Sequence, residues 1–250
     1  FIDLDQLQSG TSKAARAGVV GEHDEVRTIN RNFIATLDWS IDPEWGVTIR
    51  LPLVSRSHDH IHNDAINGPE PESWSFTNVG DIQAVGRYTF YQDADGDAGV
   101  RFGLKLPTGS ISQKNDAGEE AERGLQPGSG STDSVLGLFY HGRFSDGGWF
   151  VQGMWQQTLH EQADYRPGSH VAVDAGMNYR VTPDWNVMLQ FNTQYKAHDS
   201  GTNAEPADSG STKVFLSPGI SYRATKDTQV YGFLQQPLYQ HVNGSQLVAD

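Results

Sequence analysis

Strict alternation of apolar and polar residues is the feature of this sequence that most limits its fold. From Trp185 to Lys196 the odd positions are apolar or aromatic, apart from Thr193, and most even positions are polar. The preceding run, 171–181, alternates in the same way. Side chains alternate across a strand, so each run predicts a strand with one apolar and one polar face. Helical periodicity is almost absent, which predicts an all-β chain.

Such runs recur along the whole chain and predict about twelve strands in a single domain, 1–250. Tight turns at 42–44 and 183–184 alternate with long polar loops at 56–73, 113–130 and 198–210. Short turns at one end and long loops at the other are typical of a transmembrane antiparallel up-and-down β-barrel. The predicted strands lie near 1–12, 26–41, 45–57, 74–91, 99–112, 131–145, 148–160, 169–182, 185–197, 211–224, 229–241 and 245 to the end. We expect the last of them, the closing strand, to be cut short.

Aromatic residues flank the apolar faces at both predicted ends. Beside the short turns they are Trp39, Trp45, Phe90, Trp149, Trp185, Tyr222 and Tyr231, and toward the long loops they are Trp74, Phe76, Trp155, Tyr165, Tyr195 and Tyr239. Two such girdles are favoured at the interfaces of a bilayer. The alternative is a soluble sandwich or lipocalin-like barrel, but the polar strand faces carry too much charge for a dry core.

Charge and composition exclude several classes of protein. The chain has 18 Lys and Arg against 31 Asp and Glu, for a net charge of -13, so no nucleic-acid partner is expected. It contains no cysteine, which excludes disulfides, thiolate metal sites and cysteine nucleophiles. No apolar run approaches the ~18 residues of a membrane-spanning helix. The N-terminus has no basic-then-apolar signal pattern, so we expect any export signal to have been removed.

Several short motifs point to a known family. They are G-L-K-L-P-T-G at 103–109, L-Q-P-G-S-G-S-T-D at 125–133, L-S-P-G-I-S-Y at 216–222 and Q-P-L at 236–238. Their order, over about residues 40–250, resembles the outer-membrane barrels named after the meta-pathway of phenol degradation, usually described as transporters. The resemblance implies a barrel in the bacterial outer membrane and supplies no catalytic residues.

The predicted inward faces carry more cations than acids. The cations are Arg50, Arg87, Arg101, Lys105, Arg143, Arg180, Lys196 and Arg223, the strand-borne acids are Asp38, Asp81 and Asp174, and His141 joins them. This excess predicts a monomeric channel whose lining favours small anionic or aromatic solutes. The alternative is a set of cross-strand ion pairs that fills the interior, because a barrel of about twelve strands lies between filled barrels and open porins.

Histidines cluster toward the long-loop end. In an extended chain His58, His60 and His62 share one face and could coordinate zinc, copper or nickel at the extracellular rim. No cofactor is required by this interpretation, and a flexible H-x-H-x-H run also binds metal adventitiously. The second functional interpretation is therefore a plugged barrel whose acidic, histidine-rich rim binds metal, haem or a partner protein.

Two further patterns are weaker. The turn 93–97 has the sequence D-A-D-G-D, which is similar to the start of a calcium loop but lacks the distal Glu, so we interpret it as a polar turn. A rim hydrolase could in principle assemble from His160 and Glu161 with Asp164, or from His198 and Asp199 with Glu205, but nothing in their spacing fixes them. The chain is accordingly expected not to be an enzyme, and its expected partners are outer-membrane lipid and a small solute.

Overall fold

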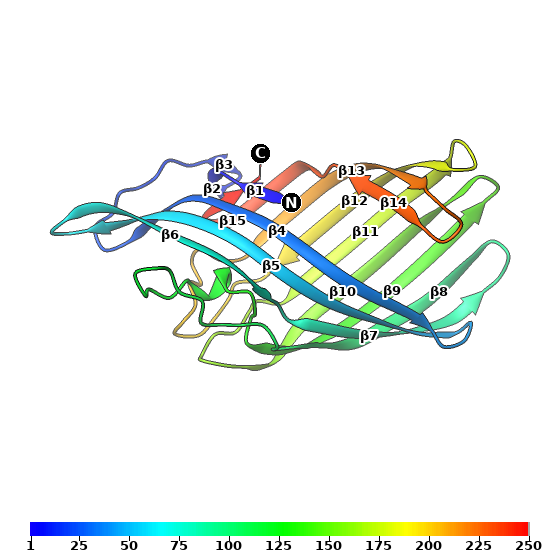
Figure 1. The fold of residues 1–250 in the computed structure, drawn as a ribbon, viewed down its shortest axis with the longest axis horizontal. Helices are drawn as coiled ribbons and strands as arrows, with labels where there is room; N and C mark the ends of the chain where they lie inside the picture. Colours follow the sequence, from blue (N-terminus) through cyan, green and yellow to red (C-terminus); the bar gives the residue numbers. More distant parts are fainter. Residues whose placement is uncertain (250) are drawn as a thin grey trace.

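Long antiparallel strands form one twisted sheet in the computed structural model, which describes residues 1–249 (Figure 1). The only helical segment in that range is the 3₁₀ turn η1 (Arg123–Leu125), and no helix there is long and apolar enough to cross a membrane. The strands are β1 (Ile2–Leu4), β2 (Gln6–Gly10), β3 (Ser12–Lys13), β4 (His23–Ser40), β5 (Trp45–Asp64), β6 (Gly68–Val79), β7 (Ile82–Gln92), β8 (Gly96–Leu106), β9 (Ser131–Phe144), β10 (Gly147–Glu161), β11 (His170–Arg180), β12 (Trp185–Lys196), β13 (Ser211–Arg223), β14 (Gln229–Phe233) and β15 (Gln236–Val248).

The all-β, up-and-down prediction is confirmed, because from β4 to β13 the strands pair antiparallel in chain order, except that β6 and β7 both pair with β5. The count differs: the sheet has fifteen strands rather than about twelve. Two predicted strands are divided in the structure. The predicted strand 1–12 is three short strands, β1 to β3, and the predicted strand 74–91 is β6 and β7, which both pair with β5 on either side of a break at Gly80 and Asp81. β14 and β15 both pair with β13.

The predicted long loop at 56–73 is wrong, because most of it is a β-hairpin. β5 continues to Asp64 and β6 begins at Gly68, with His58 opposite Trp74 in the register between them. The histidine run therefore belongs to a strand that extends well past the ~9–11 residues needed to cross a bilayer. β8 also departs from its prediction, since it begins at Gly96 and ends at Leu106.

The N-terminal segment contacts both ends of the strand order. β1 pairs with β4, whereas β2, only one residue further on, pairs with β15. Residues 2–10 thus lie between the first and the last long strands of the sheet. The short strand β1 and part of β15 accordingly lie near each other in Figure 1.

The chain reverses within β15. The side-chain amide of Gln240 donates to the backbone carbonyl of Ala249 at 2.8 Å, although nine residues of uninterrupted strand would separate the two by ~30 Å. The pairing with β2 shifts register between Val242 and Ser245, and Gly244 has φ of +58°. The gap between the strands predicted at 229–241 and from 245 on therefore corresponds to a reversal, although both sides of it belong to the single strand element β15.

Most large apolar side chains of the strands lie on the outer face of the sheet, where they are exposed. Leu138 of β9 is 63% exposed, whereas its strand neighbours Val135 and Phe139, on the opposite face, are buried. All seven aromatics predicted beside the short turns are exposed. At the other end Trp74 and Tyr165 are buried, so their assignment to an outward girdle is wrong. An apolar exterior around polar inner faces is the arrangement that a sheet facing lipid requires.

Leu138→Arg tests whether this outer face meets lipid. In a bilayer the arginine is expected to lower the free energy of unfolding by about 2–4 kcal/mol, because charge on the lipid face of a barrel is poorly solvated. Leu138→Ala, which adds no charge, is the matched control. Urea unfolding in lipid vesicles measures both variants. Equal stabilities would contradict a lipid-facing position, since exposed positions in water tolerate such changes within ~0.5 kcal/mol.

Candidate functional site

The connection between β8 and β9, residues 107–130, folds back against the inner faces of the strands, and we call it the inner loop. On one side, the indole nitrogen of Trp74 on β6 donates to the carbonyl oxygen of Glu119 at 3.1 Å. Nearby, the guanidinium of Arg56 on β5 donates to the carbonyl oxygen of Gly124 at 3.3 Å. Loop residues Ala121 and Gln126 are buried. A surface loop would instead leave its backbone in water.

On the other side, the inner loop meets the β10–β11 connection. The guanidinium of Arg123 lies over the ring of Tyr165, 5.1 Å from its centre, in a cation–π contact. The hydroxyl of Tyr165 donates to Asp199 at 3.0 Å. Burial, followed by the charge of Asp199, raises the pKa of Tyr165, so this hydroxyl stays protonated and can donate. The loop thus bridges the β5–β6 wall and the loops beyond β10.

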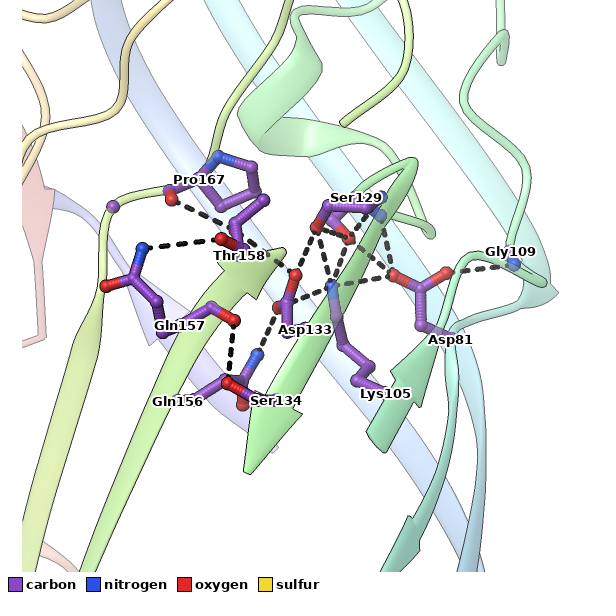
Figure 2. A network of polar contacts seen from close by, with 12 residues as sticks. Asp81, Lys105, Gly109, Ser129, Asp133, Ser134, Gln156, Gln157, Thr158 and Pro167 are labelled. Atoms are coloured by element: carbon purple, nitrogen blue, oxygen red, sulfur yellow. Dashed lines mark hydrogen bonds and ion pairs between the residues drawn. The ribbon is translucent and has the colours of Figure 1, made fainter. Parts of the chain in front are cut away.

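A polar network anchors both ends of the inner loop at the break between β6 and β7 (Figure 2). The carboxylate of Asp81 accepts the backbone N–H groups of Gly109 at 3.0 Å and Ser129 at 2.8 Å. The ammonium of Lys105 lies 3.2 Å from Asp81 and 3.0 Å from Asp133 on β9. We call these five residues the latch. Apart from Asp81, its members come from the two motifs, 103–109 and 125–133, that carried the family resemblance.

Two glycines let the ends of the loop touch. A Cβ atom on Gly128 would lie 2.5 Å from the carbonyl carbon of Gly109, and one on Gly109 would lie 2.6 Å from the Cα of Gly128. Both distances are far shorter than a van der Waals contact, and the obstructing atoms are backbone. Glycine is therefore required here for the close approach of the two segments.

Gly128→Val is expected to detach the inner loop from the latch, because the new side chain collides with the backbone of Gly109. Amide hydrogen exchange across 119–130 should then become at least several-fold faster. Gly124→Val is the control in the same loop, since a Cβ there meets no atom within 4 Å. Equal protection in the two variants would show that the glycine contact does not hold the loop.

Three polar cavities surround the inner loop, with volumes of about 330, 520 and 640 Å³. Gly124 lines all three. The first extends to Lys105 and Lys196, and the third extends to His23 on β4 and to Leu247 at the end of β15. The loop accordingly separates spaces that belong to different sectors of the sheet.

Three arginines form a cluster on neighbouring strands below the loop. Arg87 of β7 lies opposite Arg101 of β8 in the register, and Arg50 of β5 pairs with Gln83, which precedes Arg87 on the same face. The guanidinium of Arg101 lies 4.9 Å from the centre of the Phe139 ring. Within residues 1–249, none of these arginines has a carboxylate within 4.0 Å. We call Arg50, Arg87 and Arg101 the arginine cluster.

Other predicted lumen cations are neutralised by acids that sequence reasoning missed. Arg143 and His141 both contact Asp97, the latter at 2.8 Å, and Lys196 lies 2.8 Å from Asp199. The sequence places Asp97 in the turn 93–97, whereas β8 begins at Gly96 and makes Asp97 a strand residue. Asp199 lies in the loop after β12, and the sequence does not reveal the path of this loop. Arg56 on β5 and Lys213 on β13 also have no carboxylate within 4.0 Å among residues 1–249, so the unpaired positive charge includes the arginine cluster but is not confined to it.

The histidine run does not form the predicted three-histidine site. The Nδ1 of His58 contacts the hydroxyl of Thr28 at 2.9 Å, and His62 lies opposite His23 in the β4–β5 register. Within residues 1–249, the one group of at least three His, Cys, Asp or Glu side chains with ligand atoms within 4.8 Å of one another is His23, His60 and Glu122. Two of its members come from outside the run.

Comparison with known proteins identifies the family. The family described as "Putative MetA-pathway of phenol degradation" matches residues 58–239. The chain belongs to this family. The resemblance seen in the motifs is confirmed, and the matched range includes the inner loop and the latch. No curated protein matches the chain.

The fold of this family member is similar to that of an outer membrane channel from Pseudomonas putida F1. The TM-score is 0.68 at 11% sequence identity, and the alignment covers 98% of this chain and 88% of that chain. At this identity the likeness shows a shared fold. Arg50 and His23, which contribute to the arginine cluster and to the histidine group, lie outside the range matched by the family.

The predicted acids Asp38 and Asp174 lie among amides and hydroxyls in this family member. Asp38 accepts the hydroxyl of Thr48 at 2.6 Å. Asp174 accepts the amides of Gln152 at 3.0 Å and Asn192 at 2.8 Å. Neither carboxylate lies within 4.0 Å of a guanidinium group of the arginine cluster, although the charge of Asp38 acts on Arg101 at longer range.

Arg180 and Arg223 end their strands at the short-turn end of the sheet. Their backbone N–H groups donate to the carbonyl oxygens of Asp146 and Asp184, at 2.7 and 2.8 Å, in the neighbouring tight turns. Both residues are exposed. They belong to the predicted opening opposite the long loops, remote from the latch.

The side chains considered for a rim hydrolase are engaged separately. The Nδ1 of His198 lies 2.5 Å from the carbonyl oxygen of Pro206, and Asp164 accepts the backbone N–H of Thr202 at 3.0 Å. The turn at 93–97 is held by Asp93, whose carboxylate accepts backbone N–H groups within the turn. Among residues 1–249 these contacts assemble no nucleophile with a base.

Proposed function

We propose that this chain is an outer-membrane channel that passes small anionic solutes, including aromatic carboxylates. The observation that carries the proposal is the arginine cluster, three adjacent guanidinium groups with no carboxylate partner among residues 1–249, inside a sheet whose outer face is apolar. Membership of the family and the fold shared with an outer membrane channel support transport in the same membrane. The chain is proposed to act by binding and passage, not by catalysis.

The proposal requires a closed barrel that works as a monomer. Two features support closure: β1 pairs with β4 while β2 pairs with β15, and the chain end reverses at Gly244 to run beside β2. Closure satisfies the backbone groups of every strand edge, which lipid cannot do. Outer-membrane lipid is accordingly the proposed surrounding of the apolar face.

A solute would enter through the cavities beside the inner loop and then meet the arginine cluster. An anion leaving bulk water is stabilised by the unneutralised guanidinium groups, and a cation is repelled. Arginine planes also stack with aromatic rings, so an aromatic carboxylate gains both interactions. The latch and Arg56 hold the inner loop beside this path, so the position of the loop would set the width of the path open to a solute.

Reversal potentials in planar bilayers test the proposal. Under a KCl gradient, the purified protein should conduct with a preference for chloride. In liposomes, benzoate should enter faster than benzylamine, a cation of matched size. No conductance and no uptake would overturn the channel assignment, whereas conductance with a cation preference would overturn only the role given to the arginine cluster.

A second candidate function, metal binding at the extracellular end, is favoured by the surroundings of His60. It is compatible with a channel, because the residues concerned lie above the arginine cluster. A partner protein at the acidic rim, haem binding and the absence of a nucleic-acid partner stay predictions.

A further inference from the structure

His60 is oriented as metal-binding histidines are. Its Nε2 lies 2.6 Å from the carboxylate of Glu72 on the adjacent strand β6, so Nε2 carries the proton and donates it. The lone pair of Nδ1 is then free, and this buried atom has no hydrogen-bond partner in the described part of the chain, 1–249. The side chain is 8% exposed. A histidine that binds a metal through one ring nitrogen usually donates the N–H of its other ring nitrogen to a carboxylate, which fixes the orientation of the ring.

The free nitrogen of His60 lies near a carboxylate, Glu122, and near a second imidazole, His23. Nδ1 of His60 lies 3.9 Å from Oε1 of Glu122, and Nε2 of His23 lies 3.1 Å from the same oxygen. The rings of His23 and His60 stack with centres 5.0 Å apart. Bonds of ~2.0–2.1 Å around a tetrahedral zinc ion place ligand atoms ~3.3 Å from one another, so the three groups need only small shifts to share one ion.

Further carboxylates near His23, His60 and Glu122 favour a cation at this position. Glu25 and Glu205 lie 3.8 and 4.0 Å from Nε2 of His23. Within residues 1–249, neither of them nor Glu122 has a Lys or Arg within 4.0 Å. Glu25 and Glu122 are partly buried and Glu205 is exposed. Carboxylates that are withdrawn from water are normally paired or bound to metal, and this applies here to Glu25 and Glu122.

We propose that His23, His60 and Glu122 bind one divalent transition-metal ion of the zinc class, with Glu72 orienting His60 and water completing the coordination. Imidazole and carboxylate ligands together suit such an ion. Glu122 belongs to the inner loop, whereas the histidines belong to β4 and β5. The ion therefore fastens the middle of the inner loop to the wall of the sheet, far along the loop from the latch.

Zinc titration of the purified full chain, in competition with a chromogenic chelator, tests the site. One zinc ion per chain is expected, with affinity falling at least about tenfold in His60→Ala and in Glu122→Gln, and about tenfold in Glu72→Gln, where only the orientation of His60 is lost. His62→Ala is the matched control and should leave the affinity unchanged. Magnesium should not compete, because it prefers oxygen ligands.

The loop supplies a second readout. Zinc should slow amide exchange across 119–125 in the wild type and leave it unchanged in Glu122→Gln, a loop variant that keeps every strand residue. If His62→Ala weakens binding as much as His60→Ala, or if all variants bind alike, the ion is held adventitiously by the histidine run and the site does not exist. Chloride preference in bilayers is a separate measurement, so either proposal can fail alone.

Discussion

Removal of the middle of the inner loop is expected to raise single-channel conductance several-fold. Gly124 lines all three cavities, so the loop occupies the space that joins them. The side chain of Gln126 donates to the carbonyl oxygen of Gln113 at 3.2 Å, which shows that the two ends of the segment between them are adjacent. Residues 114–125 can therefore be replaced by Gly-Gly without pulling on the latch.

Planar-bilayer recordings measure this effect. The matched control changes only Asp116 and Ala117 of the exposed tip, next to Gly118, to glycine and should conduct as the wild type does. Heat-modifiable migration in gels shows whether each barrel has folded. Unchanged conductance in the folded 114–125 variant would contradict the position given to the loop on the solute path.

Arg101→Glu is expected to abolish the preference for anions. At ~6 Å from a passing ion, one unit charge is worth about 0.7 kcal/mol in water and about 3 kcal/mol at an effective dielectric constant of 20. The substitution changes two unit charges beside Arg87, and ~1.4 kcal/mol corresponds to a tenfold ratio. The anion-to-cation permeability ratio should therefore fall by about tenfold or more.

Arg143→Gln is the matched control for Arg101→Gln, because Arg143 is already paired with Asp97. Neutralising Arg101 should lower the ratio, and neutralising Arg143 should change it much less. The reversal potential under a salt gradient gives both values. Equal effects would mean that charge along the whole lumen, rather than the arginine cluster, sets selectivity. High salt should shrink both shifts through screening.

Local pattern predicted much of the wall. The alternation in 185–196 requires only that neighbouring side chains take opposite faces, and β12 has those bounds almost to the residue. The outward position of the short-turn aromatics follows from the same alternation of faces. The tight turns predict that consecutive strands pair, and this holds except for β6, which does not pair with β7. The prediction failed at 56–73, where the polar histidine run predicts a loop but forms part of β5. The sequence does not show that the inner loop packs against these polar side chains.

The candidate site depended on contacts between distant segments. Asp81, Lys105 and Ser129 meet only when the loop turns inward, and Asp97 neutralises Arg143 across forty-six positions of chain. Motif recognition marked the region of the latch, since both of its segments belong to the family pattern. No spacing in the sequence pointed from His60 to Glu122 or from His23 to either.

The amino-acid sequence by itself determined the class of fold, the two chemically different faces and the family, because strand alternation, turn residues and short motifs are local properties. Only the tertiary structure decided which cations stay unneutralised, where the inner loop lies and which histidines share a ligand. Those properties depend on the path of loops after strand pairing has brought remote residues together, and that path is set by a few long-range contacts such as those of Asp81 and Arg56.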